Sequence, residues 1–158
     1  MLKGNNFAKS IVAGMSISPR TVNLSTVNGN AIVEPWRSAR QISFLIQGGD
    51  LPGTTVMVVS FQGRLRGTST WTNLKKADGV TDMILSGSRF NDGGALENGT
   101  LVASLDLGRI NSTLYDAIRI NVTNTAATAA FMSVAHMLAD LYSHPSTQTD
   151  ETAALQTP

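Results

Sequence analysis

Hydrophobic and polar residues alternate most clearly in the segment YDAIRINVT, between Tyr115 and Thr123. Ile118, Ile120 and Val122 fall on one side of an extended chain, and the residues between them fall on the other. Alternation of this kind in β-branched residues is typical of a strand with one face in a core and the other turned outward. We therefore expect the rest of the chain to be organised around this strand.

The same alternation recurs in other segments, which are joined by short stretches rich in glycine, proline and asparagine. These segments are residues 20–26, 31–34, 40–47, 54–66, 70–76, 82–85 and 100–107. Gly63 interrupts the inward row of the longest segment, which indicates a β-bulge or the close approach of another backbone. Asn28-Gly29 is a two-residue turn signal, so a hairpin is expected between the segments on either side of it.

Residues 130–142 (AFMSVAHMLADLY) fit two structures. Their alanine, methionine and leucine content favours a helix, with Phe131 and Leu138 on its apolar face. They also fit a strand that has Met132 on its inner face and pairs back on residues 115–123, because the link between the two segments is short. The strand is favoured, and the helix stays open as the alternative.

Short strands, short links and the absence of a βαβ rhythm together predict an all-β fold. We expect an antiparallel β-sandwich, of which the jelly roll is one form, over residues 20–143. Residues 1–19 carry few periodic signals and are expected to form an extended N-terminal arm that orders against a partner. Residues 144–158 are polar and are expected to form a flexible C-terminal tail.

The amino-acid composition excludes some kinds of functional site and favours some kinds of partner. The chain has 158 residues, no cysteine, 15% charged residues and a net charge of +1. A chain of this length buries roughly 70% of its unfolded surface, and without cysteine it has no disulfides, thiolate zinc sites or Cys nucleophile. The near-zero charge offers no general attraction to nucleic acid or membranes, and a weakly charged surface suits close contact with other proteins.

No targeting segment is recognised in the sequence. The apolar part of the N-terminus, Ile11 to Met15, is short for a signal peptide and contains a glycine. No apolar run approaches the roughly 20 residues that a membrane helix needs. We therefore expect a soluble protein that is made in the cytoplasm.

Motifs for catalysis, metal binding or phosphate binding are missing, so we expect neither an enzyme nor a cofactor. His136 lies in an apolar segment, where a packed or hydrogen-bonded histidine is favoured over a ligand or general base. The stretch from Asn91 to Gly94, with Glu97, has some features of a calcium loop, but a plain surface loop is favoured because the EF-hand spacing is absent.

One predicted hairpin gathers Arg64, Arg66, Lys75 and Lys76, with Trp71 nearby. Cations on a single hairpin would bind nucleic acid only weakly and with strong salt dependence, so no specific nucleic-acid partner is expected. A tryptophan between cations also suits sugar stacking or protein contact. A solvated outer face, with Trp71 partly in the core, is favoured over any ligand surface.

A second candidate contact point follows Pro35, because Trp and Arg are the commonest anchors of protein interfaces. The two points together give the candidate protein-contact residues, which are Trp36, Arg37, Arg40, Arg64, Arg66 and Trp71. No catalytic, cofactor or metal residue is added to this set.

The order of several segments along the chain resembles that of tailed-bacteriophage virion structural proteins, specifically capsid decoration (cement) proteins and related minor head proteins. The segments are VNGNAIVEPW (27–36), RQISF (40–44), GR (63–64), TWTNL (70–74), YDAIRI (115–120) and NT (124–125). The resemblance covers most of residues 20–143 and includes no shared catalytic or ligand motif, so no site residue carries over from it.

This resemblance implies a non-enzymatic protein that assembles in the host cytoplasm as a homotrimer or homodimer. It would then bind the major capsid protein on the outer surface of the virion and cement neighbouring subunits. Two other functions stay open. One is a carbohydrate-binding or host-adhesion module with Trp36 or Trp71 as a stacking platform, and the other is a neck or tail component of the same particle.

Overall fold

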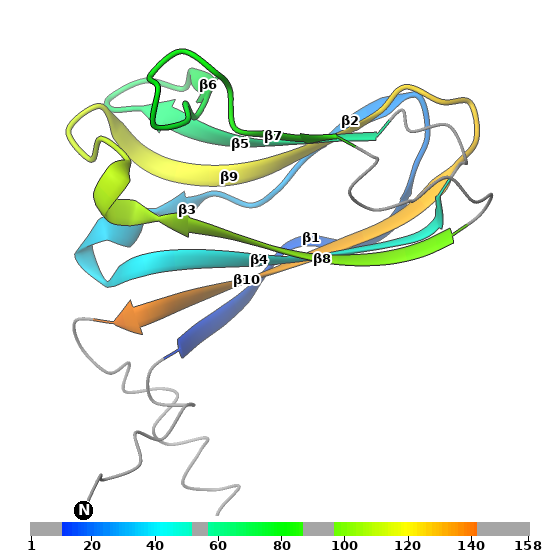
Figure 1. The fold of residues 1–158 in the computed structure, drawn as a ribbon, viewed down its shortest axis with the longest axis horizontal. Coiled ribbons are helices and arrows are strands. Elements are labelled where there is room, and N and C mark those ends of the chain that lie inside the picture. Colours follow the sequence, from blue (N-terminus) through cyan, green and yellow to red (C-terminus); the bar gives the residue numbers. More distant parts are fainter. Residues whose placement is uncertain (1–10, 52–56, 87–96, 142–158) are drawn as a thin grey trace, which may run out of the picture.

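The computed structural model describes residues 11–51, 57–86 and 97–141, which form two antiparallel sheets packed face to face (Figure 1). The first sheet contains, in spatial order, β1 (Ile11–Val22), β10 (Ala130–Leu141), β4 (Ala39–Leu51) and β8 (Glu97–Asp106). The second contains β2 (Ser25–Asn28), β9 (Tyr115–Asn124), β5 (Met57–Leu65) and β6 (Trp71–Asn73), with β3 (Ile32–Val33) paired to β9 and β7 (Ile84–Ser86) paired to β5. The all-β sandwich predicted from alternation is confirmed.

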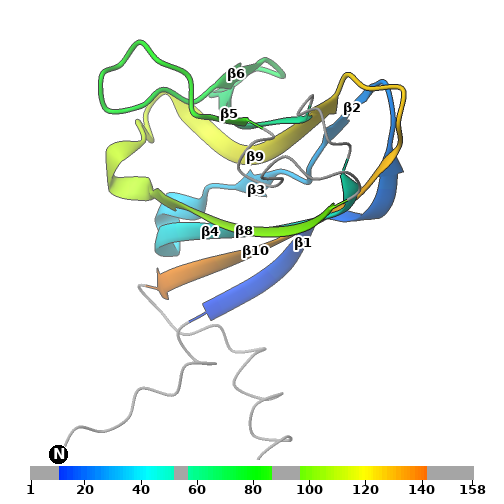
Figure 2. The ribbon, with the colours of Figure 1, turned by 45° about the vertical axis from the view of Figure 1, so that its right-hand side comes forward.

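The strand order is that of a jelly roll. The first strand pairs with the last, β2 and β3 pair with β9, β4 pairs with β8, and β5 pairs with β6 and β7. The partners are thus nested along the chain, and the links carry the chain from one sheet to the other (Figure 2). Two sheets built by such a nested antiparallel ribbon define the jelly-roll architecture.

The described residues also include short 3-10 helical turns. They are η2 (Pro35–Arg37), before β4, and η4 (Leu107–Arg109), after β8. None of the described helices is long or apolar enough to cross a lipid bilayer.

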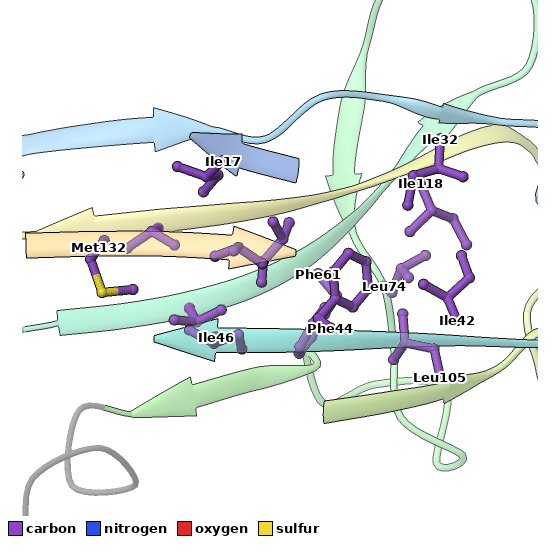
Figure 3. Close-up of a cluster of buried hydrophobic side chains, with 14 of the residues drawn as sticks. Ile17, Ile32, Ile42, Phe44, Ile46, Phe61, Leu74, Leu105, Ile118 and Met132 are labelled. Carbon is purple, nitrogen blue, oxygen red and sulfur yellow. The ribbon is translucent and has the colours of Figure 1, made fainter. Parts of the chain in front are cut away.

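The core lies between the sheets and is filled by the inward positions of the central strands. Ile118, Ile120 and Val122 of β9 are fully buried, as the alternation predicts. Phe44 of β4 and Phe61 of β5 meet across the gap with their ring centroids 5.5 Å apart, so they join the two layers (Figure 3). Burying each such side chain contributes about 1.5–3 kcal/mol to folding.

Gly63 marks a close contact, but the bulge that the sequence suggested does not fall on it. Gly63 pairs regularly with Ile118, and the register of β5 and β9 shifts between Arg64 and Leu65, where Asp116 of β9 is left without an opposite residue. A Cβ atom placed on Gly63 would lie 2.5 Å from Cδ1 of Tyr115. The tyrosine ring therefore packs directly on the backbone of β5, and only a residue without a side chain leaves room for it.

The favoured strand over residues 130–142 is confirmed as β10, but its predicted partner is wrong. The strand lies between β1 and β4 in the first sheet, with Val134 opposite Ile46. It does not pair with β9, which belongs to the second sheet. The short link that follows Asn124 crosses between the sheets and does not turn the chain back within one of them.

The predicted hairpin at Asn28-Gly29 is also wrong. Strands β2 and β3 do not pair with each other, since both lie antiparallel to β9 on the same side of it. The Gly29 amide donates to the carbonyl of Ile120 at 2.8 Å, which holds the connection between them against β9. The glycine is thus needed for close approach to a neighbouring strand and not for a hairpin turn.

The predicted N-terminal arm overlaps a strand. Residues 11–19 of the 1–19 segment lie in β1, so the sandwich begins before the predicted boundary at residue 20. The register of β1 against β10 shifts on both sides of Ile17. These irregularities break the two-residue alternation of apolar and polar side chains that marks a strand in the sequence. Residues 1–10, the predicted tail at 144–158 and the stretch from Asn91 to Gly94 lie outside the described residues.

Candidate protein-contact site

The predicted basic hairpin forms as β5 and β6, and it places Arg64 directly opposite Trp71. The strand β9 runs along the other side of β5, where Ala117 is opposite Arg64 and Arg119 is opposite Gln62. The outward side chains of three strands therefore meet on one face of the second sheet. We call the surface formed by Arg64, Arg66, Trp71, Gln62 and Arg119 the hairpin face.

Arg66 is bound by groups of three different segments. Its NH1 and NH2 groups donate to the two carboxylate oxygens of Glu34 at 2.7 and 3.4 Å. Its NH2 also donates to the backbone carbonyls of Ser112 and Tyr115 at 2.7 and 3.0 Å. The hydrogen bond from Arg66 lowers the pKa of the Glu34 carboxyl, so this pair is charged at neutral pH.

Arg64 has an acidic partner of its own. Its Nε donates to Oδ1 of Asp116 at 2.7 Å, with both side chains partly buried. This hydrogen bond lowers the pKa of the Asp116 carboxyl. The guanidinium carbon of Arg64 also lies 5.8 Å from the centre of the Trp71 ring.

Trp71 lies beneath a second cation, which the prediction did not include. The guanidinium carbon of Arg119 is 4.2 Å from the Trp71 ring centroid, within the range of a cation–π interaction. Nε of Arg119 donates to Oε1 of Gln62 at 2.9 Å, which fixes the guanidinium in place. Partial burial lowers the pKa of Arg119 from its very high ordinary value, and the group stays charged.

The network continues to the edge of the sheet. Gln62 donates to Asn73 at 3.3 Å, and Asn73 donates to Asp82 at 2.9 Å. Asp82 also forms an ion pair with Lys75. Of the hairpin cations, Lys75 is thus held internally in the same way as the two arginines. The hairpin face is an ordered network of polar groups and not a set of independent charges.

The second predicted contact point lies on and beside η2. Trp36 is half-buried and packs against the core, and its buried Nε1 group has no hydrogen-bond partner among the described residues. Arg37 is 78% exposed and lies 3.6 Å from Glu34, and Arg40 is exposed on β4. Because Glu34 also binds Arg66, it joins the two points that the sequence predicted separately.

Sequence reasoning missed one cation of this surface, Arg119, and the acidic and amide side chains around it, namely Glu34, Gln62, Asn73, Asp82 and Asp116. Arg119 carries a detectable signal, since it falls on the outward side of the organising strand. Finding its partner would have required the pairing of β9 with β5, which alternation alone does not reveal. Whether the six predicted residues contact another protein stays a prediction.

His136 belongs to a separate, partly buried position between β1 and β10. The Ser16 hydroxyl and Nδ1 of His136 are hydrogen-bonded at 2.8 Å. A Cβ atom placed on Gly14 would lie 2.7 Å from the His136 ring. Burial lowers the pKa of His136, so the imidazole is neutral at pH 7. The described residues contain no group of three or more His, Asp or Glu side chains arranged to hold a metal ion.

Comparison with known proteins gives only distant likenesses. No family model and no curated protein matches the chain. Among solved structures, a protein of the disulfide-linked pili of Bacillus endospore appendages is 12% identical with a TM-score of 0.37, and the match covers 84% of this chain and 90% of that one. The VP2 subviral particle of infectious bursal disease virus is 8% identical with a TM-score of 0.44, over 83% of this chain and 32% of that one.

A carbohydrate-binding module specific for non-crystalline cellulose is also similar, with 9% identity and a TM-score of 0.37, over 73% of this chain and 63% of that one. The chain thus spans about a third of the viral capsid protein and most of the pilus protein. Likenesses at this level do not identify what the chain binds.

Proposed function

We propose that this chain is a structural virion protein that binds the outside of a phage capsid lattice as an oligomer and stabilises neighbouring capsid subunits. The order of segments described above suggests this class, and the hairpin face provides the physical support. Its cations are already held by Glu34, Asp116 and Gln62, so little side-chain freedom remains to be lost on docking. A rigid, preordered polar surface suits repeated protein contact.

The exposed arginines beside this face provide its steering charges. Arg37 lies 3.6 Å from Glu34, Arg40 follows on β4, and both side chains are exposed. Repeated over a closed shell, individually modest contacts resist expansion collectively through multivalency. We further propose that the chain has no catalytic activity and that the major capsid protein is its partner.

The carbohydrate-binding alternative depends on a free aromatic surface, and the geometry of Trp71 does not favour it. A sugar ring stacks on an indole face that is open to solvent. Arg119 lies over the Trp71 ring and is itself anchored to Gln62, so stacking would require breaking this contact. Trp36 is packed against the core, so part of its ring surface is also already in use.

Co-sedimentation with capsids that lack this protein tests the proposal. We expect the wild-type chain to pellet with such capsids, and we expect Arg37→Glu to weaken pelleting at least several-fold by reversing an exposed charge. Arg20→Glu, an equal charge change on an exposed position of β1, is the matched control and should pellet normally. Failure of the wild-type chain to pellet, with binding to a glycan array, would replace the proposal with the adhesion alternative.

The copy number per particle separates the remaining structural role. Quantifying the protein in stained gels of purified virions should give a number that matches the shell lattice. A number that matches a single ring would identify a neck or tail component, and it would contradict the cement function.

A further inference from the structure

The outward face of the first sheet differs sharply from the hairpin face. One row of side chains crosses all four strands, because Met15 of β1 is opposite Ala135, Ala135 is opposite Leu45, and Leu45 is opposite Val102 of β8. Every member of the row is apolar. Met15 is 45% exposed and Val102 is 57% exposed, so the row ends in large hydrophobic side chains that reach solvent.

The rows on either side contain no charge. On one side lie Ala13, Met137, Ser43 and Ser104, in register across the same strands. On the other side lie Ser133, Gln47 and Thr100. We call these rows, together with the apolar row, the neutral face. The first charged residue beyond them is Asp106, opposite Gln41 at the margin.

The serine hydroxyls of the neutral face have partners on the face itself. The hydroxyls of Ser43 and Ser104 are 2.8 Å apart, and the Ser133 hydroxyl donates to Oε1 of Gln47 at 3.2 Å. These hydroxyls would keep a partner if water were excluded from the face, which lowers the desolvation cost of covering it. An exposed apolar patch with a satisfied polar rim is the usual mark of a protein interface.

The absence of charge on this face favours a second copy of the same chain as its occupant. A charged patch repels its own copy, whereas a neutral patch meets no such penalty in an isologous contact. Three rows about 6.8 Å apart, on four strands about 4.8 Å apart, give a flat footprint of roughly 400 Å². This is about half of the roughly 800 Å² per partner of a stable interface, so the contact must also include residues around the three rows.

We propose that two copies of this chain pack through their neutral faces, related by a two-fold axis that runs along the strands. This operation reverses the order of the apolar row, so Met15 meets the partner's Val102. It also sets Leu45 against the partner's Ala135, which fits a large side chain into the space above a small one. Aligned packing of this kind is a standard arrangement of two sheets. The inference rests on the oligomeric part of the proposed function and names the surface that forms the oligomer.

Light scattering on the purified full chain tests the proposal without any capsid. The wild-type protein should have the mass of a dimer. Val102→Lys should have the mass of a monomer with an unchanged circular dichroism spectrum, because the side chain is exposed within one chain. Ile84→Lys, on β7 of the opposite sheet and 41% exposed, should remain dimeric. A monomeric wild-type chain, or a dimeric Val102→Lys variant, would overturn the proposal.

Cysteine cross-linking tests the arrangement of the two copies. Because the natural chain has no cysteine, each introduced cysteine is the single thiol of its variant. Packed sheets lie about 10 Å apart, beyond the roughly 7 Å between Cα atoms that a direct disulfide spans, so a short bismaleimide cross-linker is used. The Met15→Cys and Val102→Cys variants should each stay uncoupled with this reagent, while a mixture of the two should form a covalent dimer. In a dimer of either variant alone, the two cysteines are offset by three strand spacings, about 14 Å, in addition to the gap between the sheets. Failure of the mixture to link, or linking of either variant alone, would overturn the two-fold arrangement.

The dimerisation experiments and the capsid experiment test different statements, so either can fail while the other succeeds. A chain that dimerises through the neutral face but does not pellet with capsids would overturn the proposed function alone. A monomer that pellets with capsids would overturn this inference and the oligomeric part of the proposed function, and it would leave capsid binding itself supported.

Discussion

Arg119 lies over the indole ring of Trp71, with its guanidinium carbon 4.2 Å from the ring centroid, although the strand β5 runs between the strands that carry them. The contact exists because β9 and β6 both pair with β5, and because the Gln62 side chain between them holds the arginine in position. Trp71, for which the sequence left ligand stacking open as an alternative, thereby joins three strands.

A double-mutant cycle on this pair should detect their coupling. Trp71→Ala and Arg119→Ala should each reduce the free energy of unfolding, and the double variant should lose about 0.5–2 kcal/mol less than the sum of the single losses. Urea unfolding followed by tryptophan-independent circular dichroism provides the measurement. Arg37→Ala, an exposed arginine outside the contact, should change stability by less than about 0.5 kcal/mol. Strictly additive losses would show that the contact contributes no stability.

Gly63→Ala should destabilise the fold because its new methyl group would lie 2.5 Å from Cδ1 of Tyr115. Overpacking of this kind typically costs about 1–3 kcal/mol. In a Tyr115→Ala background the same change should be close to neutral, because the ring that it meets is absent. Chemical unfolding of the four proteins measures both effects, and an equal cost in both backgrounds would exclude the tyrosine as the cause.

A chain that lacks residues 1–18 should lose most of β1, including the buried Ile17, and with it the pairing along one edge of β10. Ile17 alone accounts for about 1.5–3 kcal/mol of burial energy. We therefore expect a much lower urea midpoint or no cooperative transition. A chain that lacks only residues 1–10 keeps β1 whole and is the control. Equal stability of the two truncated chains would show that residues 11–18 act as an arm after all.

The stability of the fold should fall as the pH drops below about 6.5 because of His136. Burial lowers its pKa from the ordinary value of 6.5, so the unfolded chain binds a proton before the folded one does. The contribution is fully present above pH 6.5 and is lost as the pH falls through the folded-state pKa. His136→Gln should flatten the stability curve between pH 7 and 5, where carboxylates titrate little. Parallel curves for the variant and the wild type would assign the acid sensitivity to other groups.

Which features of the fold could be predicted from the sequence has a physical explanation. Alternation reports which side chains of a strand face inward, since the side-chain period of a strand is two residues wherever it lies. The inward positions of β4, β5 and β9 were predicted correctly for this reason, with Phe44, Phe61 and Ile120 all buried. Strand identity over residues 130–142 was likewise accessible, through its alternation and length.

The pairing of strands could not be predicted from the sequence, because the same alternating pattern is compatible with any neighbouring strand that offers an apolar face. The hairpin at Asn28-Gly29 and the return of β10 onto β9 were plausible from loop length, yet the jelly roll sends these segments elsewhere. The irregular register of β1 hid its periodicity, so its residues 11–19 were assigned to the arm.

The sequence by itself thus determined an all-β, cysteine-free, weakly charged module, its inward residues and its outward cations. Only the tertiary structure decided which cations meet which acids, that Glu34 joins the two predicted contact points, and that the first sheet presents an uncharged face. The reason is that burial depends on a residue and its nearest neighbours along the strand. Partnership between side chains depends on strand order, which arises from the packing of the whole chain.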